Sequence, residues 1–403
     1  MKILHLCTGY PLSFQGGITN YVRMLAEKQS INNQVSVVGG GDNKKDHYPF
    51  EYYEYETKVK LPYLGKAKDK KALKKLKEYI KVKKFDLIHI HMMLDIDWEI
   101  VDVLSEYNNY IISLHDYFFI CTRIILLNYN GNLCSDYDKR KCRNCISRTE
   151  QIKLVDKILK KVRINRMNIQ QSITDERYYK FKMLLENAKL LLPVSNRVEE
   201  IYKEAGIKGN YKVVHIGNYS AEEFRPFKIQ DNWKKEINIG MIGTLSKHKG
   251  ADLLFKILGK INREDIKFNF YGRCSGVYEK LFNGTKLNNW GPYKQQDLAN
   301  ILEQIDLGLV IPIWEDNAPQ VVMELLNNGK PIIGTKMGGI PDFVNNDNGY
   351  LFNPYDEEEI NKVIEYINNL DFNEINRLKK NIVRTKTPDE HEKELMEIYQ
   401  TII

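Results

Sequence analysis

Short apolar runs alternate with helical patterns along almost the whole chain, and this alternation constrains the fold more than any other feature. The first half contains the runs "MKILHLC", "QVSVVGG", "FDLIHIH", "YIISLHD", "KLLLPVS" and "YKVVHIG". A second series contains "INIGMIGTL", "IKFNFYG", "NWG", "DLGLVIP", "PIIGT" and "GYLF". Such alternation predicts parallel strands that helices cover on both faces. We therefore expect an α/β protein with two doubly wound, Rossmann-like domains in tandem.

A polar, irregular stretch, "NYSAEEFRPFKIQDNWKKE", separates the two series and is interpreted as the connection between the domains. A chain of 403 residues also exceeds the size at which a single core stops growing. The last segment has apolar residues at helical spacing, which predicts a helix that packs back toward the N-terminal domain. The expected boundaries are 1–218 for the N-terminal domain, 219–236 for the linker, 237–386 for the C-terminal domain and 387–403 for the terminal helix.

Charge and composition narrow the class of protein. The formal net charge of +7 is modest, so it favours an acidic substrate or surface without requiring nucleic acid. The opening "MKILHLCTGYPLSF" lacks a small-residue cleavage site, and no run of about 18 apolar residues follows anywhere. The six cysteines are too sparse for a secreted disulfide scaffold. We expect a cytoplasmic protein, soluble or peripheral at the inner face of the cell membrane.

The segment from Lys66 to Lys84 is strongly basic, with ten Lys against two acids. Leu73, Leu76 and Ile80 form an apolar stripe within it, so the pattern predicts an amphipathic helix. Its lysines form either a solvated face or a surface for anionic phospholipid, and the sequence leaves both interpretations open.

The stretch "DLGLVIPIWEDNAPQVVMELLNNGKPIIGT" places acids in an otherwise apolar strand, helix and strand. Asp316 lies in the loop where the first strand ends, with Glu315 beside it, and Glu324 lies on the following helix. Gln320, Glu324 and Asn327 or Asn328 would share one polar stripe on that helix. Because an unpaired buried carboxylate is costly, this stripe is either solvated or part of a binding site.

Two other loops are expected at the same edge of the second sheet. After "INIGMIG" comes "TLSKHKGADLL", which leads into a helix whose amino end could hold a diphosphate, with Lys249 supplying charge. The adjacent glycines of "KMGGIPD", Gly338 and Gly339, would let backbone amides approach a ligand closely.

These residues together resemble the GT-B retaining glycosyltransferases of group 1, the family of sucrose synthases and phosphatidylinositol mannosyltransferases. The resemblance rests on "YPLSFQGGITNYVRMLA", "DLIHIH" and "SLHDYFFICTR" in the first half and on "GTLSKHKGADLL", "WEDNAPQVVMEL" and "GGIPDFV" in the second. It implies a GT-B fold with an interdomain cleft. It also implies that Glu324 binds the ribose of a nucleotide diphosphate sugar, such as a UDP-sugar, and that Asp316 contacts the transferred sugar. Asp316 stands where the family usually has Glu, which leaves open whether Glu315 or Asp316 meets the sugar.

The resemblance assigns roles to further residues. Lys249 matches the lysine of the family's phosphate loop, whereas Thr244 occupies the place where an arginine is frequent. Backbone amides and Lys249 would then carry more of the diphosphate charge, helped by His248 or Arg273. Gly17, with Gly16, matches the glycine pair of the loop after the first strand, and His115 matches the histidine beside the transferred sugar. The sequence shows no acidic metal motif, which favours metal-independent catalysis without a cofactor.

Four cysteines crowd one stretch of the first domain: Cys121, Cys134, Cys142 and Cys145. Four thiols suit a structural zinc ion, which takes four sulfurs in tetrahedral geometry. Only the last two form a close Cys-x-x-Cys pair, so buried thiols without metal remain the alternative.

We therefore expect a retaining, metal-independent transferase that moves a sugar from a nucleotide diphosphate sugar to a glycan or lipid-linked acceptor, in bacterial surface polysaccharide synthesis. The alternatives are a sugar-nucleotide epimerase or hydrolase of the same fold and a non-catalytic carbohydrate-binding protein. The sequence does not name the sugar, the base, the acceptor or the oligomeric state.

Overall fold

The protein is described by a computed structural model. The described residues are 1–7, 16–39, 47–55, 70–94, 96, 98–135, 142, 145, 166–224, 236–274, 276–282 and 285–403. The chain divides into two compact units. Unit 1 comprises Met1–His215 with Pro388–Ile403, and unit 2 comprises Ile216–Thr387. The residues 225–235, most of the expected linker, lie outside the described residues.

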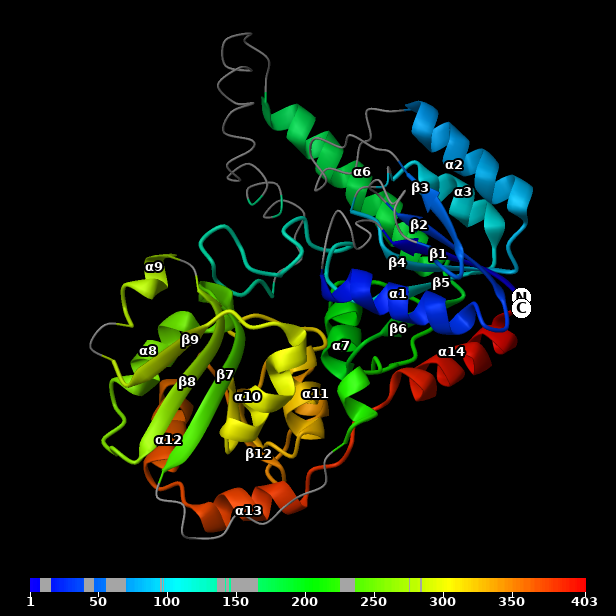
Figure 1. Cartoon of the computed structure of the whole chain (residues 1–403). Helices are drawn as coiled ribbons and strands as arrows, with labels where there is room; N and C mark the ends of the chain where they lie inside the picture. The colour runs from blue at the N-terminus through cyan, green and yellow to red at the C-terminus, as the bar shows by residue number, and fades with distance from the viewer. Residues whose placement is uncertain are drawn as a thin grey trace. The chain divides into compact units, whose positions relative to one another are not determined.

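Unit 1 contains a six-stranded parallel sheet in the order β3-β2-β1-β4-β5-β6. The strands are β1 (Lys2–Cys7), β2 (Gln34–Gly39), β3 (Glu51–Glu54), β4 (Leu87–Met92), β5 (Tyr110–Leu114) and β6 (Leu190–Pro193). The helices are α1 (Gly17–Gln29), α2 (Lys70–Lys83), α3 (Ile100–Tyr107), α6 (Arg166–Glu186), α7 (Asn196–Glu204) and α14 (Pro388–Ile402). Figure 1 shows α2, α3 and α6 on one side of this sheet and α1 and α14 on the other. The arrangement is that of a Rossmann-like unit.

Unit 2 repeats this plan with a parallel sheet in the order β12-β11-β10-β7-β8-β9. Its strands are β7 (Ile237–Leu245), β8 (Ile266–Cys274), β9 (Leu287–Gly291), β10 (Leu307–Val310), β11 (Ile332–Thr335) and β12 (Gly349–Phe352). Its helices are α8 (Ala251–Leu258), α9 (Gly276–Glu279), α10 (Leu298–Gln304), α11 (Gln320–Asn327), α12 (Glu357–Asn368) and α13 (Phe372–Lys380), with 3-10 turns η2 (Tyr219–Ala221), η3 (Lys247–Lys249), η4 (Gln295–Asp297) and η5 (Ile340–Asp342). The central strands are almost wholly buried, because helices cover both faces of the sheet.

The terminal helix α14 belongs to unit 1, where it packs on α1. Leu395, Ile398 and Tyr399 are buried on its inner face. The burial of this apolar stripe agrees with the helical spacing of these residues in the sequence.

Two segments differ from the expected strands. The run "YKVVHIG" is not a strand. It lies beside β6 as irregular extended chain, joined by a bridge between Leu191 and Tyr211 and by a bond from the Val214 amide to the Pro193 carbonyl. Strand β3 was not expected, because its sequence, EYYE, carries no apolar run. As an edge strand it is only partly buried, so it does not need a run of apolar residues.

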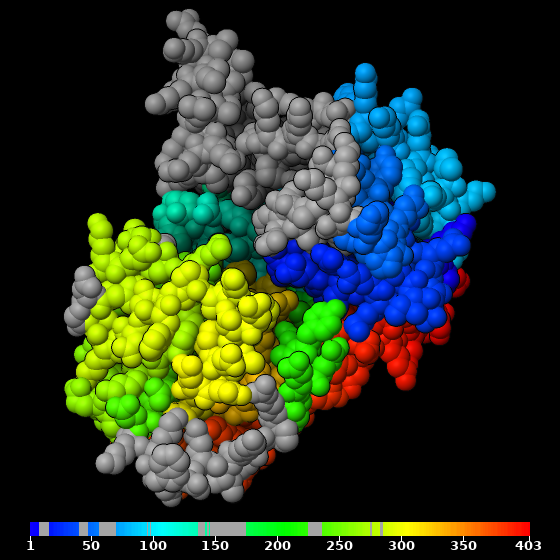
Figure 2. All heavy atoms as spheres, viewed as in Figure 1, coloured from blue at the N-terminus to red at the C-terminus, as the bar shows by residue number. Residues whose placement is uncertain are grey.

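The basic helix is present as α2, whose Leu73, Leu76 and Ile80 are buried while most of its lysines are exposed. Figure 2 shows its side chains, in light blue, standing at the surface of unit 1. None of the described helices combines the length and the apolar character needed to cross a membrane.

Candidate functional site

The turn after β7 is shaped by a close approach to the end of β10. Gly250 follows η3 with a φ of +88°, and a Cβ atom there would lie 1.9 Å from the Ile311 carbonyl oxygen. Only glycine fits this position. The Ile313 amide also donates to the His248 carbonyl at 3.0 Å, so the two loops hold each other. Lys249 is therefore fixed at the carboxyl ends of β7 and β10, where open parallel sheets bind ligands.

Lys249 and Asp316, to which the resemblance gives separate roles, are brought together as an ion pair. The Lys249 Nζ atom donates to Asp316 Oδ2, and the side chains are 36% and 13% exposed. The same ammonium group lies 5.3 Å from the centre of the Trp314 ring, a cation–π contact. A cation at the edge of water, held by one carboxylate, can exchange that partner for an anionic ligand.

Thr244 and Arg273 are Cα partners in the register of β7 and β8. Both side chains are exposed at the carboxyl ends of their strands. Side chains of directly paired residues lie on the same face of a sheet, so a guanidinium stands beside the threonine. Arg273 thus offers a cation next to the position where the family frequently has arginine.

The adjacent acids Glu315 and Asp316 have different surroundings. Glu315 is 5% exposed, and its Oε2 accepts a bond of 2.8 Å from the Gly338 amide. Asp316 instead faces Lys249, and its carbonyl accepts from the Gly339 amide at 2.8 Å. Glu315 stabilises the loop through its bond to the Gly338 amide. Asp316 is therefore the acid that is directed at the candidate site.

Gly338 and Gly339, which the sequence predicts beside a ligand, lie against the acidic loop. Their backbone amides donate to Glu315 Oε2 and to the Asp316 carbonyl. Gly338 has a φ of +53°, and a Cβ atom there would lie 2.0 Å from the Asp316 carbonyl oxygen. These glycines allow two loops to touch, and in this way they set the position of Asp316.

Glu324 lies midway along α11 and is half-buried. Burial raises the pKa of its carboxyl group, against a smaller lowering by a long, 3.5 Å contact with the Gln295 amide. The group therefore lacks strong partners among the described residues and is suited to a ligand that donates hydrogen bonds.

The polar stripe expected on α11 is only partly present. Asn327 is buried, and its Nδ2 donates to Ser220 Oγ at 2.9 Å and Thr385 Oγ1 at 2.8 Å. Its Oδ1 accepts from the Thr385 amide. Asn327 thus fastens α11 inside unit 2, because a buried amide needs all its bonds satisfied.

In unit 1, His115 directly follows β5. Its Nε2 lies 3.1 Å from His91 Nδ1, and its ring meets the Tyr21 ring edge-on at 4.7 Å. Burial lowers the pKa of His115 to about 3. The imidazole is therefore neutral at physiological pH and offers one donor and one acceptor nitrogen.

Gly17 is the first residue of α1 and is exposed, and Gly16 caps the helix through bonds with Thr19. The rest of the predicted glycine loop, residues 8–15, lies outside the described residues.

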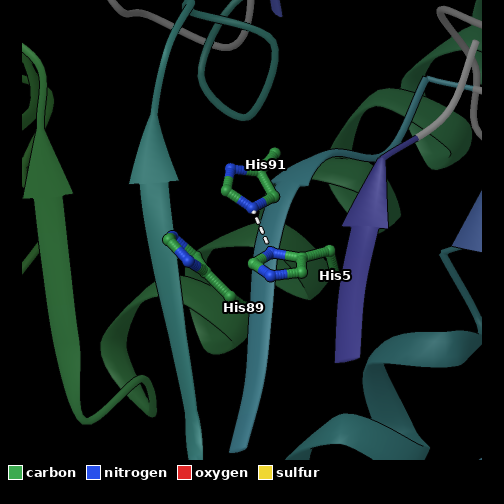
Figure 3. A group of neighbouring side chains, drawn as sticks. All are labelled: His5, His89 and His91. Carbon is green, nitrogen blue, oxygen red and sulfur yellow. Dashed lines mark hydrogen bonds between the residues drawn. The ribbon is translucent and has the colours of Figure 1, made fainter. Parts of the chain in front are cut away.

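The sheet of unit 1 carries a group of histidines that the sequence-based expectations did not include. His5, His89 and His91 are buried on neighbouring strands β1 and β4, and their ring nitrogens lie within 4.8 Å of one another. Figure 3 shows the rings facing each other, with His5 bonded to His91. Among the described residues, this is the group whose donor atoms could hold a metal ion. The signal was present in "DLIHIH", where histidines recur every second residue of a strand that should be apolar.

The four cysteines of the predicted zinc site are electrostatically coupled. Burial, together with smaller effects of Cys121, Cys134 and Cys145, raises the pKa of Cys142 to about 12. Burial also raises the pKa of Cys121, while hydrogen bonds from the Arg123 and Leu126 amides lower it. The fold thus brings together four thiols that are spread over 25 residues. Among the described residues, however, their sulfur atoms do not all lie within 4.8 Å of one another, as the ring nitrogens of His5, His89 and His91 do.

Comparison with known proteins gives matches to both the sequence and the fold. Residues 223–384 match the family model of glycosyl transferases group 1. The chain is 31% identical over 127 residues to a sulfoquinovosyl transferase of Arabidopsis thaliana, covering 30% of this chain and 24% of that protein. Other curated relatives are matched over 48% and 54% of their lengths, so the chain spans about half or less of the relatives it matches.

Solved structures agree with the fold over the whole chain. HepE from Anabaena, solved in complex with UDP, has a TM-score of 0.65 and 16% identity, and both chains are covered completely. Sucrose-phosphate synthase from Thermosynechococcus elongatus has a TM-score of 0.66 and 16% identity, with 100% of this chain and 98% of that chain covered. The expected fold class is confirmed: the protein has the GT-B fold, and its residues 223–384 match the family model of glycosyl transferases group 1.

Proposed function

We propose that the protein is a retaining, metal-independent glycosyltransferase that uses a nucleoside diphosphate sugar, with UDP as the first nucleotide to test. The observation that carries this proposal is the ion pair of Lys249 and Asp316 at the carboxyl ends of β7 and β10. A diphosphate presents negative charge and a sugar presents hydroxyl groups, and this pair offers a partner for each. The UDP complex of HepE, which shares the fold, supports the choice of nucleotide.

In this proposal donor binding replaces the Lys249–Asp316 pair. Lys249 turns to the diphosphate, with exposed Arg273 as a second cation, and Asp316 is left to accept hydrogen bonds from sugar hydroxyls. Water reaches the Lys249 side of this pair, and solvent-exposed ion pairs contribute only about 0–1 kcal/mol. The loss of the pair is therefore readily offset by bonds to a doubly charged ligand. Lys249 and Arg273 together take the stabilising role that a divalent metal has in other transferases.

Glu324 is proposed to accept hydrogen bonds from the ribose hydroxyls. Its carboxyl group is half-buried, and its described side-chain bond is the long contact with Gln295. Hydrogen bonds to a charged acceptor contribute about 1.5–3 kcal/mol each, and they would restore the ionised form that burial disfavours.

For chemistry we propose that His115 contacts the transferred sugar and that the leaving phosphate takes the proton of the acceptor hydroxyl. The protein then contributes positioning and charge stabilisation, without a covalent intermediate on a side chain. The acceptor would be a glycan or a lipid-linked glycan, as in the synthesis of bacterial surface polysaccharide. The exposed lysines of α2 favour a peripheral site of action at an anionic membrane.

The test begins with a thermal-shift screen of nucleoside diphosphate sugars, since bound ligand raises the melting temperature. A stabilising donor is then incubated with and without glycan acceptors, and the products are separated. Release of nucleoside diphosphate that depends on an acceptor supports transfer. Free sugar or an epimer as the product would favour the hydrolase or epimerase alternative, and binding without turnover would favour a carbohydrate-binding protein.

We also propose a structural zinc ion at Cys121, Cys134, Cys142 and Cys145. The support is the coupling of the four thiols and the turn around Cys121, whose sulfur receives two backbone N–H groups. This turn holds Ile124 and Leu126 at φ values of 70° and 52°. Non-glycine residues adopt such angles at a cost of about 1–3 kcal/mol each, which persists where the surroundings fix them. Binding of zinc would bring the four neighbouring sulfur atoms to the distances of metal ligands.

Elemental analysis of protein prepared without chelators should find about one zinc per chain. Cys142→Ser should lower both zinc content and melting temperature. Cys274→Ser is the matched control, because Cys274 is a partly buried thiol of unit 2. Metal-free wild-type protein with unchanged stability in Cys142→Ser would leave the thiols as packing residues.

A further inference from the structure

The histidines of the unit 1 sheet form a continuous line of hydrogen bonds that ends at His115. Gln29 Oε1 lies 2.8 Å from His5 Nε2, and His5 Nδ1 lies 2.9 Å from His91 Nε2. His91 Nδ1 lies 3.1 Å from His115 Nε2. Gln29 ends α1, and the three histidines come from β1, β4 and the end of β5. They share the sheet face that α1 covers.

Each imidazole of this line is uncharged. Burial lowers the pKa of His5 to about 4, although its bond to Gln29 acts in the opposite direction. Burial also lowers the pKa of His91 well below its usual value, and the neighbouring histidines lower it further. A neutral imidazole has one N–H donor and one acceptor nitrogen, so the protonation of one nitrogen decides the role of the other.

The order of donors and acceptors along the line therefore follows from its first member. In the amide orientation of the structure, the Gln29 oxygen Oε1 faces His5 and the amide nitrogen Nε2 has no described hydrogen-bond partner. An oxygen can only accept, so in this orientation His5 carries its proton on Nε2 and accepts at Nδ1. His91 must then donate from Nε2 to His5 and accept at Nδ1. His115 must donate from Nε2 to His91, which makes its own Nδ1 an acceptor.

A metal ion is a weaker explanation of the same cluster. The nitrogens of His5 and His91 that face each other are already joined through a proton. Both nitrogens of His89 are engaged, with the Tyr399 hydroxyl at 2.5 Å and Ser113 Oγ at 2.8 Å. A metal would have to replace these bonds and would add charge to a fully buried group of neutral rings.

We propose that Gln29, His5 and His91 are positioning residues that fix His115 as the tautomer protonated at Nε2, so that its Nδ1 accepts a hydrogen bond from a hydroxyl of the transferred sugar. The sugar contact rests on the proposed function, whereas the tautomer does not. The direction of the bond suits the reaction. As positive charge develops on the sugar, its hydroxyl becomes a stronger donor and the bond to an acceptor nitrogen strengthens.

The tautomers can be measured without any substrate. The chain has only eight histidines, so selective ¹⁵N-histidine labelling gives a simple long-range ¹H–¹⁵N spectrum in which the two neutral tautomers differ. His5→Gln, His91→Gln and His115→Gln assign the signals. The expected wild-type result is a proton on Nε2 of His5, His91 and His115. A proton on Nδ1 of His115 would overturn the proposal, and so would stoichiometric bound metal together with metal-shifted ring signals.

Gln29→Met tests whether the line acts on His115, because it removes the acceptor that sets the order and keeps the length of the side chain. We expect a mixture of His115 tautomers and a kcat about 5- to 10-fold lower, with the KM for the donor nearly unchanged. Ser113→Ala is the matched control, since it removes a buried hydrogen bond from His89, which lies outside the line. It should leave the His115 signal and kcat unchanged.

The outcomes separate this proposal from the proposed function. An unchanged His115 signal in Gln29→Met, or a kcat loss equal to that of Ser113→Ala, overturns the positioning role. A mixed tautomer in Gln29→Met, in a protein that transfers no sugar from any donor, supports the positioning role and overturns the function instead. If Gln29→Met does not fold, the wild-type spectrum still decides the order of the line.

Discussion

The two units have sheets of matching strand order but opposite chemistry at the carboxyl ends of their strands. Unit 1 presents His91 and His115, both neutral, in a line of hydrogen bonds. Unit 2 presents Lys249, Asp316 and Glu324, which are ionisable and partly open to water. Neutral rings can be buried in a line because they carry no charge to desolvate. In such a line the tautomer of one ring determines which nitrogen of the next ring donates and which accepts. Ions at the edge of water can exchange partners.

The largest expected effect is a loss of stability at low pH that is greater in unit 1 than in unit 2. Burial holds the pKa of His5 at about 4 and of His115 at about 3, and it also lowers the pKa of His89 and His91 well below the unfolded value of about 6.5. The unfolded chain therefore binds protons below pH 6.5 that the folded chain does not. Stability of unit 1 is complete above that pH and falls by about 1.4 kcal/mol per pH unit and per histidine as the pH drops.

This effect can be measured by unfolding the protein in urea at pH 7.5 and at pH 5.0 and monitoring the unfolding of each unit by hydrogen exchange. Peptides of unit 1 should lose protection at pH 5.0 before peptides of unit 2. His89→Phe should reduce the slope against pH, because it removes one titrating group of similar size. An equal loss of protection in both units, or no loss of protection at pH 5.0, would contradict the proposed difference between the units.

Next in size is the effect of His115→Ala on turnover. The variant removes the proposed hydrogen bond to the sugar, which is expected to strengthen in the transition state, so kcat should fall on the order of 10- to 1000-fold, while donor KM changes less. We expect a smaller effect on the melting temperature, although the variant also removes the hydrogen-bond partner of His91, because His115 lies at the end of the strand with its side chain partly exposed. Near-normal turnover together with a large fall in melting temperature would make His115 a structural residue.

The parts of the molecule that the sequence predicted are those in which one periodicity decides the structure. The apolar runs of β1, β2, β4 to β8 and β10 to β12, and the buried stripe of α14, follow directly from the hydrophobic pattern. Strand β3 was missed because an edge strand can be polar. The run "YKVVHIG" was overpredicted, because its apolar residues are buried beside β6 without joining the sheet by a regular ladder.

The candidate site was predicted as separate residues, whereas its connections depend on tertiary contacts. No local pattern pairs Lys249 with Asp316, assigns Glu315 to the Gly338 amide or turns Asn327 inward, because these contacts join segments 23 to 67 residues apart. The histidine line was missed for the same reason. Its members come from different strands, and only register and sheet order bring them together.

A smaller effect distinguishes the acids of unit 2. Glu324→Ala should weaken binding of UDP by about 1.5–3 kcal/mol, because ribose loses a charged acceptor. Asp316→Ala should lower turnover more than affinity for the bare nucleotide, since its proposed partner is the sugar. Isothermal titration with UDP and with GDP, on both variants, measures the difference.

Glu358→Ala is the matched control for this pair, as it removes an exposed glutamate of α12 that pairs with Lys362. It should bind nucleotide as the wild type does. Unchanged affinity in Glu324→Ala would remove the ribose assignment, and the charged site of unit 2 would then rest on Lys249 and Asp316 alone.

The smallest effect concerns the other face of the unit 1 sheet, where α2 presents exposed lysines instead of buried histidines. Several of these lysines form surface ion pairs, including Lys74 with Glu78 and Lys83 with Glu51, which contribute little in water and leave the helix positively charged. Near an anionic membrane each lysine contributes about 1 kcal/mol, and salt screens the attraction. We therefore expect sedimentation with anionic vesicles at low salt, reversal at high salt, and no sedimentation with neutral vesicles.

The lysines of α2 can be removed without disturbing the side of the helix that packs on unit 1. Replacing Lys70, Lys75 and Lys77 by Gln should weaken vesicle binding and leave the fold unchanged, because the buried stripe consists of Leu73, Leu76 and Ile80. Equal partition into neutral and anionic vesicles would make α2 a solvated helix, and a lipid-linked acceptor would then need another route to the protein.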